Sequence, residues 1–154
     1  MLVTISGLPG SGTTTAGRLL ADARGWEFQS SGELFRSMAD ARGVSLAEFG
    51  ALAEGDERID RELDERAVTL MRDTAGLVME GRLAGWMAFR NALGEARVWL
   101  ESDVATRARR VADRDGGSAS EQQAAMTARE TSEAARYRNY YDIDIGSREP
   151  YTLI

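Results

Sequence analysis

A glycine-rich segment near the start of the chain carries the strongest chemical signal. Residues 7–14 read GLPGSGTT and match the phosphate-loop pattern G-x-x-x-x-G-K-[ST] except at the lysine, where Thr13 stands. Such glycines let backbone N–H groups turn toward an anion, and Thr14 occupies the hydroxyl position that binds Mg²⁺. The alternative is a glycine-rich turn that binds nothing. The residues predicted to hold the ATP phosphates are Gly7, Leu8, Pro9, Gly10, Ser11, Gly12, Thr13, Thr14 and Thr15.

The missing lysine leaves the transferring phosphoryl group in need of another cation. All 19 basic residues are arginine, so the replacement must be an arginine or Mg²⁺. Arg107, Arg110 and Arg114 are spaced i, i+3 and i+7, which places them on one helical face. We expect this face to close over ATP, with Arg110 among the catalytic residues. The alternative is a solvated basic stripe that pairs with neighbouring aspartates.

Two further groups of residues suit phosphate chemistry. Glu80 ends an apolar strand, where an acid would meet a Mg²⁺-bound water opposite the phosphate loop, and Arg82 follows at the same edge of the sheet. Arg129, Glu133 and Arg136 are spaced i, i+4 and i+7, so two guanidinium groups flank one carboxylate. Intrahelical ion pairs with no further role are the alternative for this second group.

The elements that must position these residues alternate between strands and helices. Expected strands cover 2–6, 26–28, 76–81 and 96–102, with a fifth beginning at Tyr151. Expected helices cover 14–24, 32–42, a segment from Ser45 with a capping box to Glu48, 57–73, 104–114 and 120–140. This order predicts a three-layer α/β fold with a mostly parallel five-stranded sheet in a single domain of 154 residues. The alanine-rich face of 120–140 suits either a moving cover or an exposed helix.

Composition excludes several classes of function. The chain has no histidine and no cysteine, which excludes imidazole bases, cysteine–zinc sites and disulfides. A net charge of −6 disfavours a nucleic-acid-binding surface. No apolar run approaches the roughly 20 residues of a membrane span, and no signal peptide precedes Met1, so we expect a cytoplasmic protein without membrane contact.

Longer stretches of the sequence resemble the cytidylate kinases of the nucleoside monophosphate kinase family, especially the archaeal-type branch. The matching stretches are ISGLPGSGTTT, SSGELFR, GVSLAEF, LAEGDERIDRELDER, MEGRLAGWM and RETSEAARY, with YDIDI close behind the last. The resemblance implies a P-loop kinase fold that transfers the ATP γ-phosphoryl group to CMP. It also implies acceptor-binding helices at about 30–75, an arginine-rich lid at about 107–140 and a monomer.

The resemblance also implies roles for individual residues. Ser31 and Arg36 match the family's contacts to the pyrimidine and its phosphate, and Arg82 matches the arginine that grips the CMP phosphate. Arg129, Glu133 and Arg136 fit the spacing in which the acid meets the ribose or base and the arginines meet phosphate.

Two departures from the family pattern stand out. Leu83 replaces the aspartate that helps hold cytosine in the bacterial form, so dCMP or UMP are further candidate acceptors. The chain ends at Ile154, inside the expected last strand, where relatives continue, so this strand is expected to be cut short.

A mechanism follows that needs no general base, because an acceptor phosphate is already anionic at neutral pH. Arg36, Arg82, Arg129 and Arg136 would hold the acceptor phosphate in line, and Mg²⁺, held by Thr14 and through water by Glu80, would bridge the ATP phosphates. The alternatives are a non-catalytic nucleotide sensor, a small-metabolite kinase with a non-nucleotide acceptor, and a purely structural domain.

Overall fold

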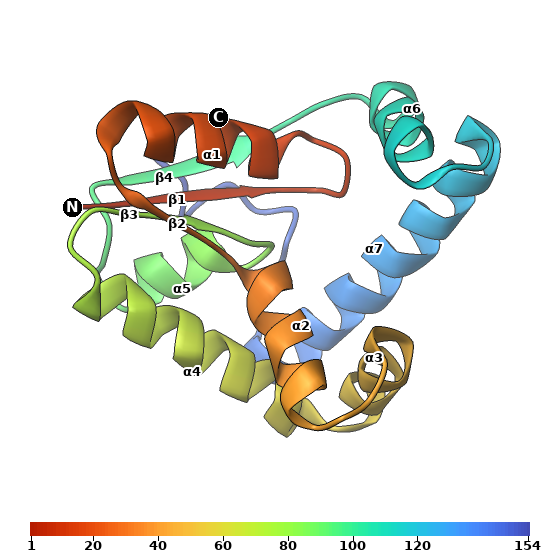
Figure 1. Cartoon of the computed structure of the whole chain (residues 1–154), viewed down its shortest axis with the longest axis horizontal. Helices are drawn as coiled ribbons and strands as arrows, with labels where there is room; N and C mark the ends of the chain where they lie inside the picture. The colour runs from red at the N-terminus through yellow and green to blue at the C-terminus, as the bar shows by residue number, and fades with distance from the viewer.

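A parallel sheet of four strands forms the centre of the molecule (Figure 1). The strands are β1 (Leu2–Gly7), β2 (Glu27–Ser30), β3 (Leu77–Glu80) and β4 (Ala96–Leu100), in the order β2-β3-β1-β4. This computed structural model describes residues 1–154, apart from the side chain of Ala47. In the register of the sheet, Glu80 stands beside Ile5 on one side and Ser30 on the other. The carboxyl ends of three strands therefore meet around one acidic residue.

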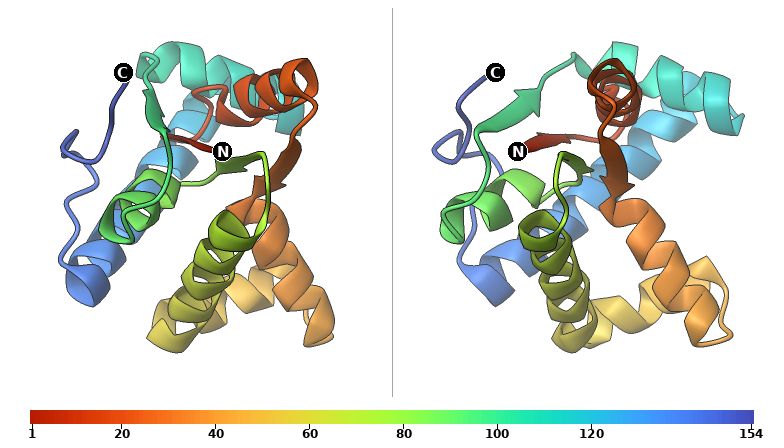
Figure 2. Two further views of the ribbon diagram at one scale, coloured as in Figure 1. Left: turned by 90° about the vertical axis from the view of Figure 1, so that its left-hand side faces the viewer. Right: turned by 60° about the vertical axis from the view of Figure 1, so that its left-hand side comes forward.

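Helices cover both faces of this sheet (Figures 1 and 2). On one face, Ala21 of α1 packs with Ile5 and Val78. On the other, α4 and α5 form a larger core that includes Met71, Met87 and buried residues of β3. The helices are α1 (Thr13–Arg24), α2 (Ser31–Ala41), α3 (Leu46–Gly55), α4 (Glu57–Asp73), α5 (Ala84–Arg90), α6 (Val104–Asp115) and α7 (Ala119–Tyr141). The predicted three-layer α/β fold with a parallel sheet is confirmed.

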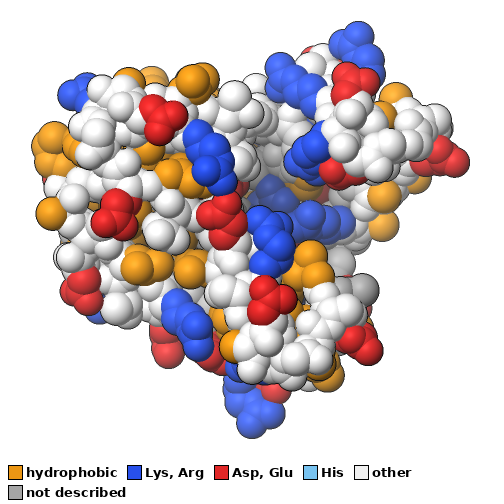
Figure 3. All heavy atoms as spheres, viewed as in Figure 1, with side chains coloured by type: hydrophobic (Ala, Val, Ile, Leu, Met, Phe, Trp, Pro, Cys, Tyr) orange, Lys and Arg blue, Asp and Glu red, His pale blue; other side chains and the backbone are white. Residues whose placement is uncertain are grey.

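Two pairs of helices project from the central layers and leave a hollow between them. One is the pair α2 and α3, and the other is α6 with the first part of α7 (Figure 1). Figure 3 shows arginine side chains gathered in the hollow between these projections.

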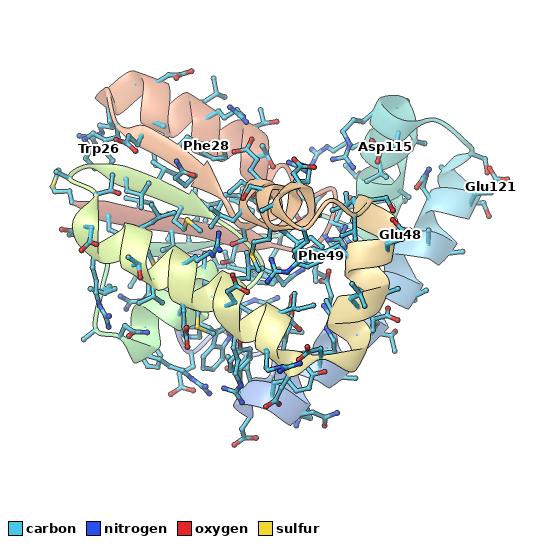
Figure 4. The ribbon with its side chains drawn as sticks, turned by 60° about the horizontal axis from the view of Figure 1, so that its bottom comes forward. Trp26, Phe28, Glu48, Phe49, Asp115 and Glu121 are labelled. Atoms are coloured by element: carbon cyan, nitrogen blue, oxygen red, sulfur yellow. The ribbon has the colours of Figure 1, made fainter. Side chains whose placement is uncertain are left out.

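Both α3 and α7 begin with a capping box, formed by Ser45 with Glu48 and by Ser118 with Glu121 (Figure 4). The first was predicted from the sequence and the second was not.

The expected fifth strand is wrong in extent. Leu153 forms only an isolated parallel bridge with Val98, and the N–H of Trp99 donates to the Leu153 carbonyl at 2.9 Å. The backbone from Asp142 to Tyr151 follows a course of turns, so the chain reaches the free edge of β4 only at Thr152 and Leu153. The segment therefore runs parallel to β4, as expected for this sheet, but a single bridged pair of residues is not a strand.

Helix α5 was not predicted at all. All five residues from Ala84 to Ala88 are buried, so the segment has no polar face and no helical periodicity to recognise. None of the described helices is long and apolar enough to cross a bilayer.

Candidate active site

The phosphate loop joins β1 to α1 in the conformation its glycines predict. Gly10 has a φ of 80° and Gly12 has a φ of 92°, both in the left-handed region that glycine adopts readily. The Ser11 hydroxyl and its N–H both donate to the Leu8 carbonyl, at 2.7 Å and 3.1 Å. Helix α1 begins at Thr13, and the first N–H groups of a helix have no acceptor within it. The loop therefore has the backbone form of an anion site.

Glu80 lies directly beside this loop. Its Oε1 accepts a hydrogen bond from the Thr13 hydroxyl at 2.9 Å, and its Oε2 accepts one from the Ser30 hydroxyl at 2.8 Å. Thr13, which stands in the lysine position of the pattern, thus contacts a carboxylate at the end of β3. Thr14 follows Thr13 in the first turn of α1, one residue beyond this contact, and its role in metal binding stays a prediction.

The residues at this point fit a magnesium ion that arrives with a nucleotide. Thr14 is exposed, and its hydroxyl makes no hydrogen bond with the described residues. Within residues 1–154 as described, no three acidic side chains gather to form a metal cage. Mg²⁺ prefers oxygen ligands and is usually held by one or two carboxylates together with substrate phosphates. One hydroxyl and one carboxylate beside a phosphate loop match that donor set.

Arg82 is the buried cation of the site. Its Nε donates to Glu133 Oε2 at 2.7 Å, one of its terminal nitrogens donates to the Gly7 carbonyl, and its side chain is only 14% exposed. Arg129 donates to the other oxygen of Glu133, also at 2.7 Å, but is largely exposed. Burial alone would raise the pKa of Glu133, yet Arg82 and Arg129 outweigh burial and hold that pKa below its ordinary value. Glu133 is therefore a carboxylate between two guanidinium groups.

Arg136 differs from the predicted arrangement. Its Nε lies 3.1 Å from Oδ2 of Asp60 on α4, so the second guanidinium beside Glu133 is Arg82 and not Arg136. The pattern on α7 could not reveal this, since Asp60 comes from another helix. Burial raises the pKa of Asp60, with Arg136 opposing and Glu133 adding to the rise.

Two of the three arginines predicted to share a face of α6 lie against the phosphate loop. Arg107 is buried and donates to the Pro9 carbonyl at 3.0 Å and to Glu130 of α7 at 2.6 Å. Arg110 lies 3.4 Å from the carbonyls of Gly10 and Ser11. Arg114 instead pairs with its neighbour Asp115, away from the loop. Arg110 and Arg114 are both exposed, and only Arg114 pairs with a neighbouring aspartate as the alternative of a solvated stripe expects.

The residues suggested for acceptor binding begin helix α2. A Cβ atom built on Gly81 would lie 2.1 Å from the Ser31 hydroxyl, so Ser31 stands directly against the Gly81–Arg82 step. Arg36 is exposed, makes no hydrogen bond or ion pair with the described residues, and lies over Gly32.

Sequence reasoning missed three polar residues that shape this region, namely Asp60, Asp64 and Tyr141. The two aspartates are four residues apart on α4, and Asp60 is buried on the helical face that also carries Ala67 and Met71. That acid within an apolar stripe was the available signal. The Tyr141 hydroxyl donates to Asp64 Oδ2 at 2.5 Å and ties the end of α7 to α4.

The carboxyl group of Asp64 is expected to make the stability of the fold depend on pH. Burial raises its pKa to about 7, whereas an unfolded aspartate titrates near 3.9. The folded chain therefore binds the extra proton between about pH 4 and pH 7, and the free energy of unfolding falls as pH rises through that window. We expect Asp64→Asn to raise the melting temperature above pH 7 by at least about 2 °C and to leave it unchanged near pH 4.

Thermal unfolding followed by circular dichroism across this range checks the expectation. Asp22→Asn is the matched control, because Asp22 is exposed on α1 and its side chain makes no hydrogen bond or ion pair with the described residues. The prediction would be contradicted if the melting temperature of the wild-type protein changed with pH in the same way as that of Asp64→Asn.

A phosphate loop between a central strand and its helix, facing an acid at the end of the neighbouring strand, defines the P-loop kinase fold. Solved structures show the same architecture. A shikimate kinase from Bacteroides thetaiotaomicron superimposes with a TM-score of 0.63 at 16% identity, covering 97% of this chain and 90% of that one. An uncharacterized protein from Eubacterium ventriosum gives a TM-score of 0.73 at 18% identity, with coverages of 99% and 85%.

The particular family follows from the sequence. Residues 2–154 match the cytidylate kinase-like family, and the chain belongs to it. The cytidylate kinase of Methanococcoides burtonii is 46% identical over 154 residues, which span 100% of this chain and 86% of that protein.

Proposed function

We propose that this protein transfers the γ-phosphoryl group of ATP to CMP, giving ADP and CDP. Family membership and the cytidylate kinases it resembles over its full length support this assignment. The observation that carries it is the position of Arg82. This buried guanidinium contacts the phosphate loop through Gly7 and the α7 carboxylate Glu133 at the same time. One cation therefore borders both the donor loop and the expected acceptor site.

Alignment and charge neutralisation account for the chemistry in this proposal. We assign Arg36, Arg82, Arg129 and Arg136 to the acceptor phosphate, because guanidinium groups suit bidentate phosphate binding. The acceptor phosphate already carries negative charge, so it attacks without a general base. Glu133 holds Arg82 and Arg129 in place and is the acid that would meet the ribose or base. Closure of the hollow would exclude water and suppress ATP hydrolysis.

The donor side of the proposal uses the whole phosphate loop. Backbone N–H groups from Gly7 to Thr15 would hold the ATP phosphates, with Thr14 and, through water, Glu80 holding Mg²⁺. When bound, Mg²⁺ would supply positive charge that offsets the charge of the ATP phosphates. Arg110 is the replacement for the missing lysine, supported by its approach to the carbonyls of Gly10 and Ser11.

We propose a single kinase domain over 1–154 whose acceptor helices lie within 30–75 and whose lid lies within 107–140. The contact of Arg107 with Pro9 supports a lid that reaches the phosphate loop. A monomer, no binding to nucleic acid and a cytoplasmic location stay predictions.

Base selectivity must come from residues other than position 83. Leu83 is 4% exposed and belongs to the hydrophobic core, so its side chain is not available to a base. Ser31, beside Gly81, is the proposed contact to the pyrimidine. Discrimination among CMP, dCMP and UMP is therefore expected to be weaker than that of an enzyme with an aspartate directed at cytosine.

An acceptor panel tests the proposal. ADP release is measured with ATP and Mg²⁺ against CMP, dCMP, UMP, AMP, shikimate and no acceptor. We expect turnover with CMP to be at least about tenfold above that with AMP. AMP would not make the hydrogen bonds that the site offers to a pyrimidine base, and losing such bonds costs that factor or more. Turnover with shikimate alone would instead favour a small-metabolite kinase, and ATP binding without any turnover would favour a sensor.

A further inference from the structure

Ser30 uses its hydroxyl group twice. The Ser30 Oγ accepts a hydrogen bond from the Gly32 N–H at 3.2 Å, which caps helix α2, and it donates to Glu80 Oε2 at 2.8 Å. Ser30 is 5% exposed, so these contacts are shielded from water. It is the last residue of β2 and pairs with Glu80 in the sheet register. Its hydroxyl thus joins the start of the expected acceptor helix to the acid at the end of β3.

Thr13 makes the corresponding contact from the other side. Its hydroxyl donates to Glu80 Oε1 at 2.9 Å from the first residue of α1, in the phosphate loop. Each carboxylate oxygen of Glu80 therefore accepts one hydroxyl, and the two hydroxyls come from opposite sides. Two such bonds restrict rotation of the carboxylate, while each oxygen keeps a further lone pair for another partner.

We propose that Ser30 and Thr13 are positioning residues that hold Glu80 toward the donor phosphates and their metal. Ser30 thereby couples the acceptor helix α2 to the donor loop. A shift of α2 would change the position of Ser30 and, through it, the orientation of the carboxylate. The inference rests on the proposed function, and it gives Thr13 a role different from that of the lysine it replaces: it orients an acid and does not neutralise a phosphate.

Helix capping alone is the competing explanation for Ser30. Glycine is nearly as good an N-cap as serine but has no hydroxyl, so Ser30→Gly removes the contact to Glu80 and costs the cap little. Thr13→Val removes the second hydroxyl at nearly constant volume, and Thr13→Ser keeps it. Ser45→Ala and Thr69→Val are matched controls, because their hydroxyls contact only their own helices.

The experiment measures ATP binding by calorimetry with and without MgCl₂, in the absence of an acceptor. We expect Ser30→Gly and Thr13→Val each to reduce the Mg²⁺-dependent gain in ATP affinity by about tenfold, the worth of a hydrogen bond to a charged group. Thr13→Ser and both controls should stay within about twofold of wild type. ATP affinity without Mg²⁺ is the baseline from which each gain is measured, and it should match wild type in Ser45→Ala and Thr69→Val.

A second comparison isolates the role of Glu80. Because the two hydroxyls act through this carboxylate, Ser30→Gly and Thr13→Val should have no further effect in a Glu80→Ala background. Equal effects in both backgrounds, or an unchanged Mg²⁺-dependent gain in Ser30→Gly, would overturn the inference. This binding assay does not depend on CMP turnover, so failure of the proposed function would appear separately, as a wild-type protein that binds MgATP without forming CDP.

Discussion

Arg82→Met lowers kcat/KM for CMP by about 100-fold or more, the expected cost of removing one charge-stabilising donor. Methionine is similar in length but has no charge and no hydrogen-bond donors. Without Arg82, the phosphate loop loses the guanidinium contact at Gly7, and the proposed acceptor-phosphate site loses its buried cation. We expect kcat to fall and KM for CMP to rise, while the affinity for ATP alone changes less.

The same substitution destabilises the fold, because Glu133 stays buried with only the exposed Arg129 as partner. The expected loss is about 3–5 kcal/mol, the typical penalty for breaking a buried ion pair on one side. Kinetics are therefore measured well below the unfolding transition, with folding checked by circular dichroism. Arg72→Met is the control, because Arg72 is exposed and contacts Asn91 far from the site. A folded Arg82→Met protein with wild-type kcat/KM would contradict the role of Arg82.

Gly10→Ala has the second largest expected effect, and it acts on the donor site. Gly10 has a φ of 80°, and a Cβ atom built there would lie 2.7 Å from the carbonyl oxygen of Arg107. The strained backbone costs about 1–3 kcal/mol, and relief of the clash would move α6 away from the loop. We expect the ATP affinity, measured by calorimetry, to fall by about tenfold or more.

Gly43→Ala separates backbone strain from the contact with α6. Gly43 also has a positive φ, of 67°, but nothing lies within 4 Å of a Cβ built on it. This variant should lose stability by about 1 kcal/mol and keep its ATP affinity. Equal losses of ATP affinity in the two variants would show that strain alone, and not the contact between the phosphate loop and α6, is responsible.

Local features made much of this molecule predictable. The apolar run before Gly7 and the glycines that follow it specify a buried strand, a tight turn and a helix within a few residues. Helix α4 was predicted with its observed bounds, Glu57–Asp73, because its apolar stripe is regular and its ends are polar. The phosphate loop, Glu80 and Arg82 could be proposed as one site because residues at the carboxyl ends of parallel strands meet.

Contacts between distant segments were not predictable from spacing. Ser30 and Glu80 are neighbours only because β2 lies next to β3, and the sequence does not specify that order. Arg136 pairs with Asp60 because α7 packs against α4, so the regular i, i+4, i+7 pattern on α7 suggested the wrong partner.

Product formation by the wild-type protein tests the central claim most directly. ATP, Mg²⁺ and CMP are incubated with the protein, and ADP and CDP are quantified together by chromatography. The proposed function predicts one CDP for each ADP and negligible ADP without CMP. Consumption of ATP without CDP, or binding of both nucleotides without any product, would contradict it.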